Sequence, residues 1–142
     1  MPANLDPATE EGARALQRLE TEMIGWLTTV TPDGQPQSTP IWFLWIDDEI
    51  IVYSYKTAKR NRNIEANSRV SFNLHTDAGG DDVVSMEGTA RFDPEGLRSS
   101  QDPAFLLKYG DWLRNVYHWT PEYFEDEYPV TTRITPTRWR LE

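Results

Sequence analysis

The sequence predicts a mainly β protein, in which six antiparallel strands form a closed or nearly closed sheet accompanied by a few helices. Short apolar and β-branched runs follow one another along the chain, and tight-turn sequences separate them. The length of 142 residues is sufficient for one hydrophobic core. Because no linker, internal repeat or low-complexity segment interrupts the pattern, we expect a single domain over residues 1–142.

The first predicted element is an amphipathic helix over residues 7 to about 21. Asp6-Pro7 combines a residue type that caps helices with one that suits the first helical position. Apolar residues then recur at helical spacing as far as Met23. The helix therefore precedes the sheet and presents one apolar face to it.

Three consecutive strands are expected over residues 24–30, 37–46 and 49–55. Thr31-Pro32-Asp33-Gly34 separates the first two and Asp47-Asp48 separates the second and third. Both connections have the residue types of tight turns, so the three strands should form an antiparallel meander.

The middle of the chain predicts a short helix followed by two more strands. The helix is expected over residues 59–67, with Asn67 closing it in the left-handed conformation. The strands are expected over residues 69–75 and 83–92, and Gly88 is the expected position of a β-bulge.

The C-terminal part predicts two helices and a sixth strand. Asp102-Pro103 repeats the cap-and-proline signal before a helix that reaches about residue 116. Thr120-Pro121 begins a short helix to about residue 127, and a strand follows over residues 130–135. The remaining residues are expected to form a basic tail.

The charge is acidic overall but uneven. The formal net charge of −9 argues against affinity for nucleic acid or for an anionic membrane. Between Ser54 and Val70, however, only Glu65 opposes five basic residues, which are Lys56, Lys59, Arg60, Arg62 and Arg69. A local patch of this kind suits a small anion such as a phosphate.

Several classes of site are excluded by residue types. The chain has no cysteine, which excludes disulfides, thiolate metal sites and cysteine nucleophiles. His75 and His118 are the only histidines, and neither has a partner at metal-binding spacing, so no metal site is expected. No signal core or transmembrane stretch is visible, and a cytoplasmic location is the expectation.

The basic patch predicts a phosphate site at the end of the sheet. Ser54 ends a strand and its hydroxyl faces the following loop, while the basic side chains gather around the start of the next helix. Backbone N–H groups at a helix start are unpaired and favour an anion. Trp42 and Phe43 would support a flat ring beside this site. From composition alone, a solvated helix face explains the basic run equally well.

The order of these motifs resembles the pyridoxamine 5′-phosphate oxidase-like split-barrel family. The matching segments are Thr28 to Gly34, Thr39 to Phe43, Tyr53-Ser54, Arg60-x-Arg62-Asn63-Ile64 and Arg69-Val70. The chain departs from the family pattern at Arg60, where a lysine is usual and Lys59 stands just before. It departs again at Ser68, which replaces a common proline.

The C-terminal half is similar to the actinobacterial branch of F-420-dependent enzymes. The resemblance there rests on Lys108-Tyr109, Trp119-Thr120-Pro121-Glu122-x-Phe124, Tyr128-x-Val130 and the segment from Arg133 to Arg138. F-420 is an 8-hydroxy-5-deazaflavin with a phosphate and an oligoglutamate tail. The resemblance spans residues 15 to 140.

The resemblance implies an FMN-binding type of split barrel that works as a homodimer. Its cofactor ring would lie in a groove between two subunits and pass a hydride to a small unsaturated or quinone-like substrate. No catalytic side chain is implied, because the cofactor holds the reactivity. The residues implied to bind the cofactor are Thr39, Pro40, Ile41, Trp42, Ser54, Lys56, Lys59, Arg60, Arg62 and Asn63.

Two alternatives remain open from the sequence. The same fold could use FMN as an oxidase or reductase. It could also be a non-enzymatic carrier of F-420, of FMN, or of a planar ligand such as heme or biliverdin. Fold alone does not decide between them.

Overall fold

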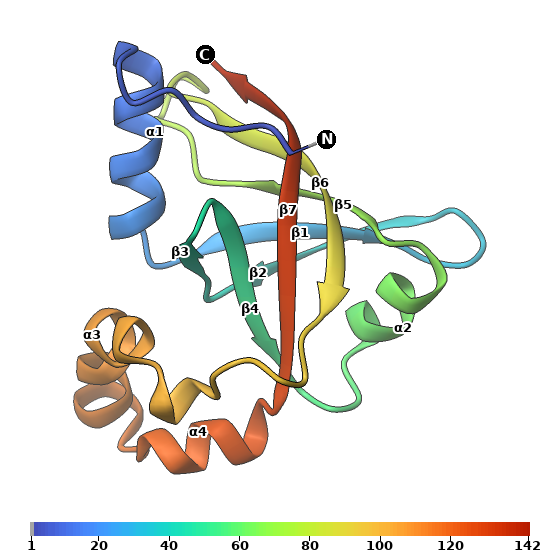
Figure 1. Cartoon of the computed structure of the whole chain (residues 1–142), viewed down its shortest axis with the longest axis vertical. Helices are drawn as coiled ribbons and strands as arrows, with labels where there is room; N and C mark the ends of the chain where they lie inside the picture. Colours follow the sequence, from blue (N-terminus) through green and yellow to red (C-terminus); the bar gives the residue numbers. More distant parts are fainter. Residues whose placement is uncertain (1) are drawn as a thin grey trace.

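The computed structural model describes residues 2–142, which form one curled antiparallel sheet with helices at its ends and side (Figure 1). The strand order is β2-β1-β5-β6-β7-β4-β3. In chain order, the strands are β1 (Gly25–Val30), β2 (Pro36–Ile41), β3 (Leu44–Ile46), β4 (Glu49–Ser54), β5 (Arg69–Asn73), β6 (Val84–Phe92) and β7 (Val130–Leu141). The mainly β, split-barrel prediction is confirmed, with seven strands instead of six.

The seventh strand arises because the predicted strand over residues 37–46 is broken at Trp42-Phe43. The Tyr109 hydroxyl lies 2.9 Å from both the backbone N–H and the carbonyl oxygen of Phe43. Phe43 therefore satisfies its backbone through a side chain of another element, and the chain turns from β2 into β3.

Strand β7 is longer than predicted and includes the residues expected as a basic tail. The predicted strand ended at residue 135, just before Pro136, and a proline has no N–H to give to a ladder. In the structure Pro136 lies opposite Gly88, at the register shift between Glu87 and Gly88. The bulge predicted at Gly88 is confirmed, and it allows the strand to pass the proline. A Cβ at Gly88 would lie 2.8 Å from the carbonyl oxygen of Thr135, so the close approach requires glycine.

The helices begin at side-chain caps where the sequence offered them. Helix α3 (Pro103–Trp112) begins at Asp102, and α4 (Pro121–Glu127) begins at Thr120, as predicted. Helix α1 (Glu10–Thr21) starts later than predicted, because Thr9 rather than Asp6 caps it and accepts from the Gly12 N–H at 3.0 Å.

Helix α2 (Lys59–Ala66) is present, but the prediction for Asn67 is wrong. Asn67 has a φ of −148°, which is extended backbone, and its side chain accepts from the Arg69 N–H at 3.1 Å. The chain therefore passes straight from α2 into β5. A 3₁₀ turn, η1 (Ser99–Gln101), precedes α3, and a π-helical turn, η2 (Leu113–Tyr117), extends it.

The two faces of β4 belong to two different cores. Ile50 and Val52 point into the curled sheet, whose interior also holds Leu19 of α1 and Phe72 of β5. The alternate residues Ile51 and Tyr53 face α3 and α4, where an aromatic cluster contains Phe105, Tyr109 and Phe124. Because side chains alternate along a strand, β4 is buried on both sides and joins the sheet to the C-terminal helices.

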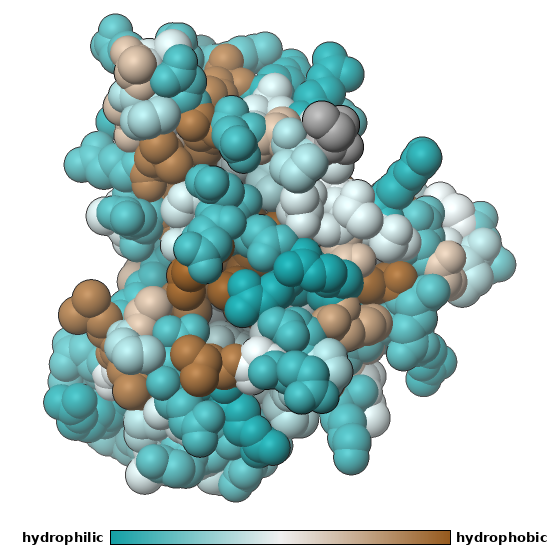
Figure 2. Space-filling view, in the orientation of Figure 1, coloured by the Kyte–Doolittle hydropathy of each residue, from teal (hydrophilic) through white to brown (hydrophobic). Residues whose placement is uncertain are grey.

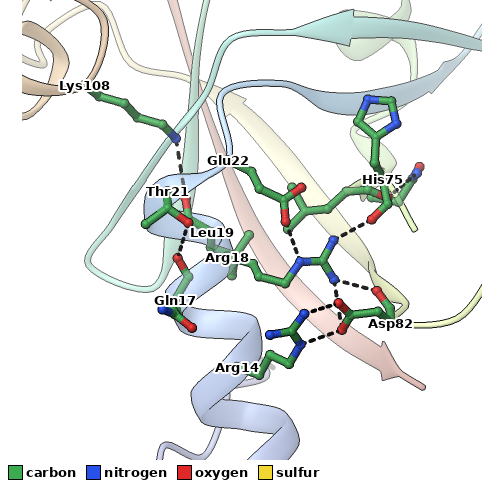
Figure 3. Close-up of polar contacts among 11 residues, drawn as sticks. Arg14, Gln17, Arg18, Leu19, Thr21, Glu22, His75, Asp82 and Lys108 are labelled. Atoms are coloured by element: carbon green, nitrogen blue, oxygen red, sulfur yellow. Dashed lines mark hydrogen bonds and ion pairs between the residues drawn. The ribbon is translucent and has the colours of Figure 1, made fainter. Parts of the chain in front are cut away.

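Helix α1 is held to the loop before β6 by a buried arginine (Figure 3). The Arg18 guanidinium pairs with Glu22 and donates to the backbone carbonyl oxygens of His75 and Asp82. Arg14 pairs with the Asp82 carboxylate. This network gives each nitrogen of the Arg18 guanidinium a partner, so it fastens the helix to that loop.

The surface in the orientation of Figure 1 is mostly hydrophilic, with apolar side chains gathered beside α1 and above α3 (Figure 2). None of the helices within residues 2–142 has the length and apolar character needed to cross a membrane.

Candidate functional site

A cavity of about 360 Å³ lies where the ends of β2 and β4 meet α2, η2 and α4. Its walls are mostly aromatic, and they include one cationic residue and no carboxylate. The lining residues are Ile24, Pro40, Ile41, Trp42, Tyr53, Tyr55, Arg60, Tyr117, Trp119, Phe124 and Tyr128. The volume falls within the range of roughly 300–1,000 Å³ that is usual for small-molecule sites.

Trp42 forms the inner wall of the cavity. Its ring stacks on Tyr109 at 4.6 Å and on Phe124 at 5.5 Å, with interplanar angles of 3° and 8°. Both rings therefore lie nearly parallel to the indole and hold it in place. Trp42, a predicted binding residue, lines the cavity and remains half-exposed. Phe43, the other expected ring support, is buried in the sheet core against Phe72 and does not line the cavity.

Arg60 is the cationic group of the cavity. Its Nε donates to the Ser54 Oγ at 2.7 Å, and Ser54 is only 1% exposed. Burial lowers the pKa of Arg60, yet a guanidinium stays charged throughout the accessible pH range. Within the part of the chain that the structure describes, Arg60 forms no ion pair. Ser54 thus positions the guanidinium beside the cavity, and the charge remains available to an anion.

A pair of tyrosines lies beside Arg60. The rings of Tyr55 and Tyr128 stack at 4.4 Å, and the Tyr128 hydroxyl donates to the Tyr55 hydroxyl at 2.9 Å. Burial, together with the bond to Tyr55, raises the pKa of Tyr128, so its hydroxyl stays protonated at neutral pH. The same end of the cavity therefore holds one guanidinium and two hydroxyls.

The predicted binding residues separate into three groups. Pro40, Ile41, Trp42 and Arg60 line the cavity. Ser54 lies behind Arg60 and holds it. The other five do not line the cavity, and they are Thr39, Lys56, Lys59, Arg62 and Asn63.

Asn63 has a structural role that its motif did not indicate. It is 5% exposed, and its Nδ2 donates to Thr29 Oγ1 at 2.9 Å and to Gln37 Oε1 at 3.1 Å. These contacts fasten α2 to β1 and β2, which places Arg60. Both amide hydrogens are used, so none remains for a ligand.

The rest of the basic patch faces outward. Lys56, Lys59 and Arg62 are exposed, and Thr39 is an exposed residue of edge strand β2. Lys56 borders a second, more open groove of about 480 Å³, whose other wall includes Glu125, Asp126 and Glu127. The solvated-face interpretation therefore describes these lysines and Arg62, whereas Arg60 belongs to the cavity.

Most of the residues of the aromatic wall were not predicted to bind a ligand. Tyr55, Tyr117, Trp119, Phe124 and Tyr128 come from three separate segments that only the fold brings together. The available signal was the high number of aromatic residues, six Trp and six Tyr in 142 residues, and their concentration after residue 104.

Neither histidine lines the cavity, although His118 stands between the lining residues Tyr117 and Trp119. His75 packs edge-on against Trp26 at 6.3 Å, and His118 adopts a left-handed φ of 57° after η2. Across residues 2–142, no group of three or more His, Cys, Asp or Glu side chains is arranged to hold a metal ion.

Comparison with known proteins places this chain in a family. The family model for pyridoxamine 5′-phosphate oxidase matches residues 12–141. A solved F-420 reductase is 25% identical, with a TM-score of 0.65 over 87% of this chain and 94% of its own. A conserved hypothetical protein from Mycobacterium tuberculosis is 27% identical, with a TM-score of 0.65 over 99% and 88%.

A FAD-binding protein from Mesorhizobium loti shares the fold at 19% identity, with a TM-score of 0.63 over 89% of this chain and 90% of its own. No curated protein matches the sequence.

Proposed function

Because the chain belongs to the pyridoxamine 5′-phosphate oxidase family, we propose that it is an oxidoreductase whose aromatic cavity holds part of a flavin-type cofactor. We name coenzyme F-420 as that cofactor, and a small unsaturated or quinone-like molecule as the hydride acceptor. The likeness to a solved F-420 reductase supports this choice. The sequence motifs after Lys108 support it as well.

The observation that carries the proposal is that the buried part of Arg60 has no carboxylate partner among the described residues. A half-buried guanidinium without a carboxylate partner is costly unless an anion balances it. Here it borders a cavity that contains no carboxylate. A ligand with an anionic group would therefore offset the free energy needed to bury the guanidinium. The phosphate of a flavin-type cofactor is such a group.

The rest of the cavity suits a flat, largely apolar body. Ile24, Ile41 and Trp119 line it together with the tyrosines. Burying an aromatic ring against apolar walls of this kind is favourable. The volume of about 360 Å³ lies near the lower end of the usual range, so the cavity accommodates part of a cofactor rather than cofactor and substrate together.

The residues of this chain bind and orient, and the cofactor when bound supplies the hydride. Ser54 and Asn63 fix Arg60, which would hold the phosphate end. Trp42, which stacks on Tyr109 and Phe124, gives the cavity a rigid wall. Rigid placement of reacting groups is itself a large part of the rate enhancement in such a reaction.

Calorimetric titrations with F-420 and with FMN, side by side, test the proposal. Tighter binding of F-420, with oxidation of reduced F-420 by a quinone or enone, is the expected result. Preference for FMN would reassign the cofactor within the same cavity. Binding without turnover would indicate a carrier, and failure of both cofactors to bind would overturn the proposal.

Substitution of the basic residues gives a sharper test. Arg60→Ala should weaken cofactor binding about ten- to a hundredfold, since a hydrogen bond to a charged group contributes roughly 1.5–3 kcal/mol. Arg62→Ala and Lys59→Ala should have small effects, because both side chains are exposed and neither lines the cavity.

Arg138→Ala is the control, since this exposed residue lies on β7 and does not line the cavity. If Arg60→Ala bound the cofactor like the parent, or if Arg138→Ala lost affinity equally, the cavity would not be a placed anion site.

A further inference from the structure

Tyr55 and Tyr128 reach the cavity from different parts of the fold. Tyr55 directly follows β4, and its backbone carbonyl accepts from Asn61 Nδ2 of α2 at 2.7 Å. Tyr128 is the C-terminal cap of α4, and its ring also stacks on Phe124 at 4.6 Å. Both side chains line the cavity with Arg60. The pair is therefore held from α2 and α4 at the point where the guanidinium lies.

The hydrogen bonds at this end leave a surplus of donors. A bond between two hydroxyls uses one hydrogen and leaves the second hydroxyl hydrogen free. Arg60 uses its Nε for Ser54, and its Nη hydrogens have no hydrogen-bond partner within residues 2–142. With no carboxylate in the lining, an anionic group brought by a ligand would pair with these donors and neutralise the guanidinium.

We propose that the Tyr55–Tyr128 pair and Arg60 form one anion site, in which a tyrosine hydroxyl and the guanidinium together bind the phosphate group of a planar aromatic ligand. The site rests on the proposed function in one respect, namely that the phosphate it would hold is the cofactor's. It adds two tyrosines to the binding residues and gives Ser54 the role of positioning Arg60.

The number of donors favours phosphate over carboxylate. Four Nη hydrogens and one hydroxyl hydrogen exceed the roughly four acceptor positions of a carboxylate. A phosphate has more oxygens and pairs with a guanidinium through two parallel bonds, which leaves an oxygen for the hydroxyl. The stacked aromatic walls then hold the ring to which the phosphate is attached.

Calorimetric titrations with FMN and riboflavin, which differ by the phosphate, test the site in the full chain. The parent should bind FMN more tightly than riboflavin. Tyr55→Phe keeps the ring and removes the hydroxyl, so it should lose about tenfold in FMN affinity and retain its riboflavin affinity. Tyr128→Phe should lose less, because the Tyr55 hydroxyl hydrogen remains.

Tyr123→Phe is the matched control, since Tyr123 packs on Trp119 at 4.8 Å and does not line the cavity. If Tyr55→Phe bound FMN like the parent, or lost FMN and riboflavin equally, the proposal would be overturned. The second outcome would mean that the aromatic wall was damaged and no phosphate donor was lost.

A second pair of probes separates this site from the proposed function. If the parent bound neither F-420 nor FMN, the same titrations would use 1-naphthyl phosphate and 1-naphthol. A preference for the phosphate that Tyr55→Phe reduces would support the anion site although the cofactor assignment had failed. Equal affinity of the parent for the two naphthyl probes would overturn the site itself.

Discussion

Lys108 is a half-buried ammonium whose partners are backbone carbonyls and aromatic rings. Its Nζ donates to the Phe43 carbonyl at 2.9 Å and reaches the Leu19 carbonyl at 3.5 Å, a contact drawn in Figure 3. It also lies 3.8 Å from the centre of the Phe43 ring. Burial lowers the pKa of Lys108 from its ordinary 10.5 to about 8, while Glu22 and Glu20 oppose the change. One side chain thus joins α3 to α1 and to the break between β2 and β3.

The titration of Lys108 predicts how stability depends on pH. Between pH 8 and 10.5 the unfolded chain holds this proton and the folded chain releases it, so the free energy of unfolding should rise with pH across that window. Below pH 8 both states are protonated and the penalty of burying the charge is constant.

Lys108→Met should remove this rise, as measured by urea unfolding of parent and variant at pH 7 to 10.5. Lys59→Met is the control, because Lys59 is exposed and should leave the slope unchanged. A Lys108→Met variant with the same pH slope as the parent would contradict the assignment.

Single residues also show how far the sequence could predict the site. Ser54 and Arg60 were predicted correctly to lie together, because only the β4–α2 connection separates them. Asn63 was predicted to bind the cofactor, yet its partners Thr29 and Gln37 lie more than 25 residues earlier. Contacts across that separation depend on sheet register, which local patterns do not reveal.

Among the elements, α2 is the one whose placement sets the position of Arg60. Asn63→Ala would leave the Thr29 hydroxyl, which is 2% exposed, without its partner. Leaving a buried polar group unsatisfied costs roughly 1–3 kcal/mol, so the free energy of unfolding should fall by about that amount. Cofactor affinity should fall as well, since α2 would hold Arg60 less firmly.

Urea unfolding and calorimetry on Asn63→Ala check this prediction. Glu65→Ala, an exposed change on the same helix, serves as the reference. Unchanged unfolding in Asn63→Ala would show that other contacts fasten α2.

The strands show a similar division between local and distant causes. The bulge at Gly88 and the caps at Asp102 and Thr120 follow from residue type and were predicted. The break at Phe43 was not, because the Tyr109 hydroxyl that causes it lies 66 residues away. The strand count therefore differed from the prediction although the fold class did not.

At the scale of the whole molecule, the curled sheet leaves β2 as an edge strand. Pro36 to Pro40 are exposed, and only Ile41 at the end of β2 is buried, so this chain leaves most of the strand uncovered. Pro40 is exposed and also lines the cavity, so a partner that covered β2 would extend one wall of the cavity. Trp42 and Trp45, the tryptophans that follow β2 in the chain, are half-buried, whereas Tyr53 of β4 is 8% exposed and packs inside the chain.

We therefore expect a homodimer in which a second copy covers β2 and closes the cavity. An isologous interface of this kind would complete two equivalent sites at once. Light scattering at micromolar concentration should give twice the 16.5 kDa of one chain.

Thr39→Arg, on the exposed edge, should shift the mass toward one chain, because two like charges would meet across the twofold axis. Cofactor affinity should fall together with the mass if the partner supplies the missing wall. A parent protein that is monomeric and still binds cofactor with full affinity would show instead that one chain builds the whole site.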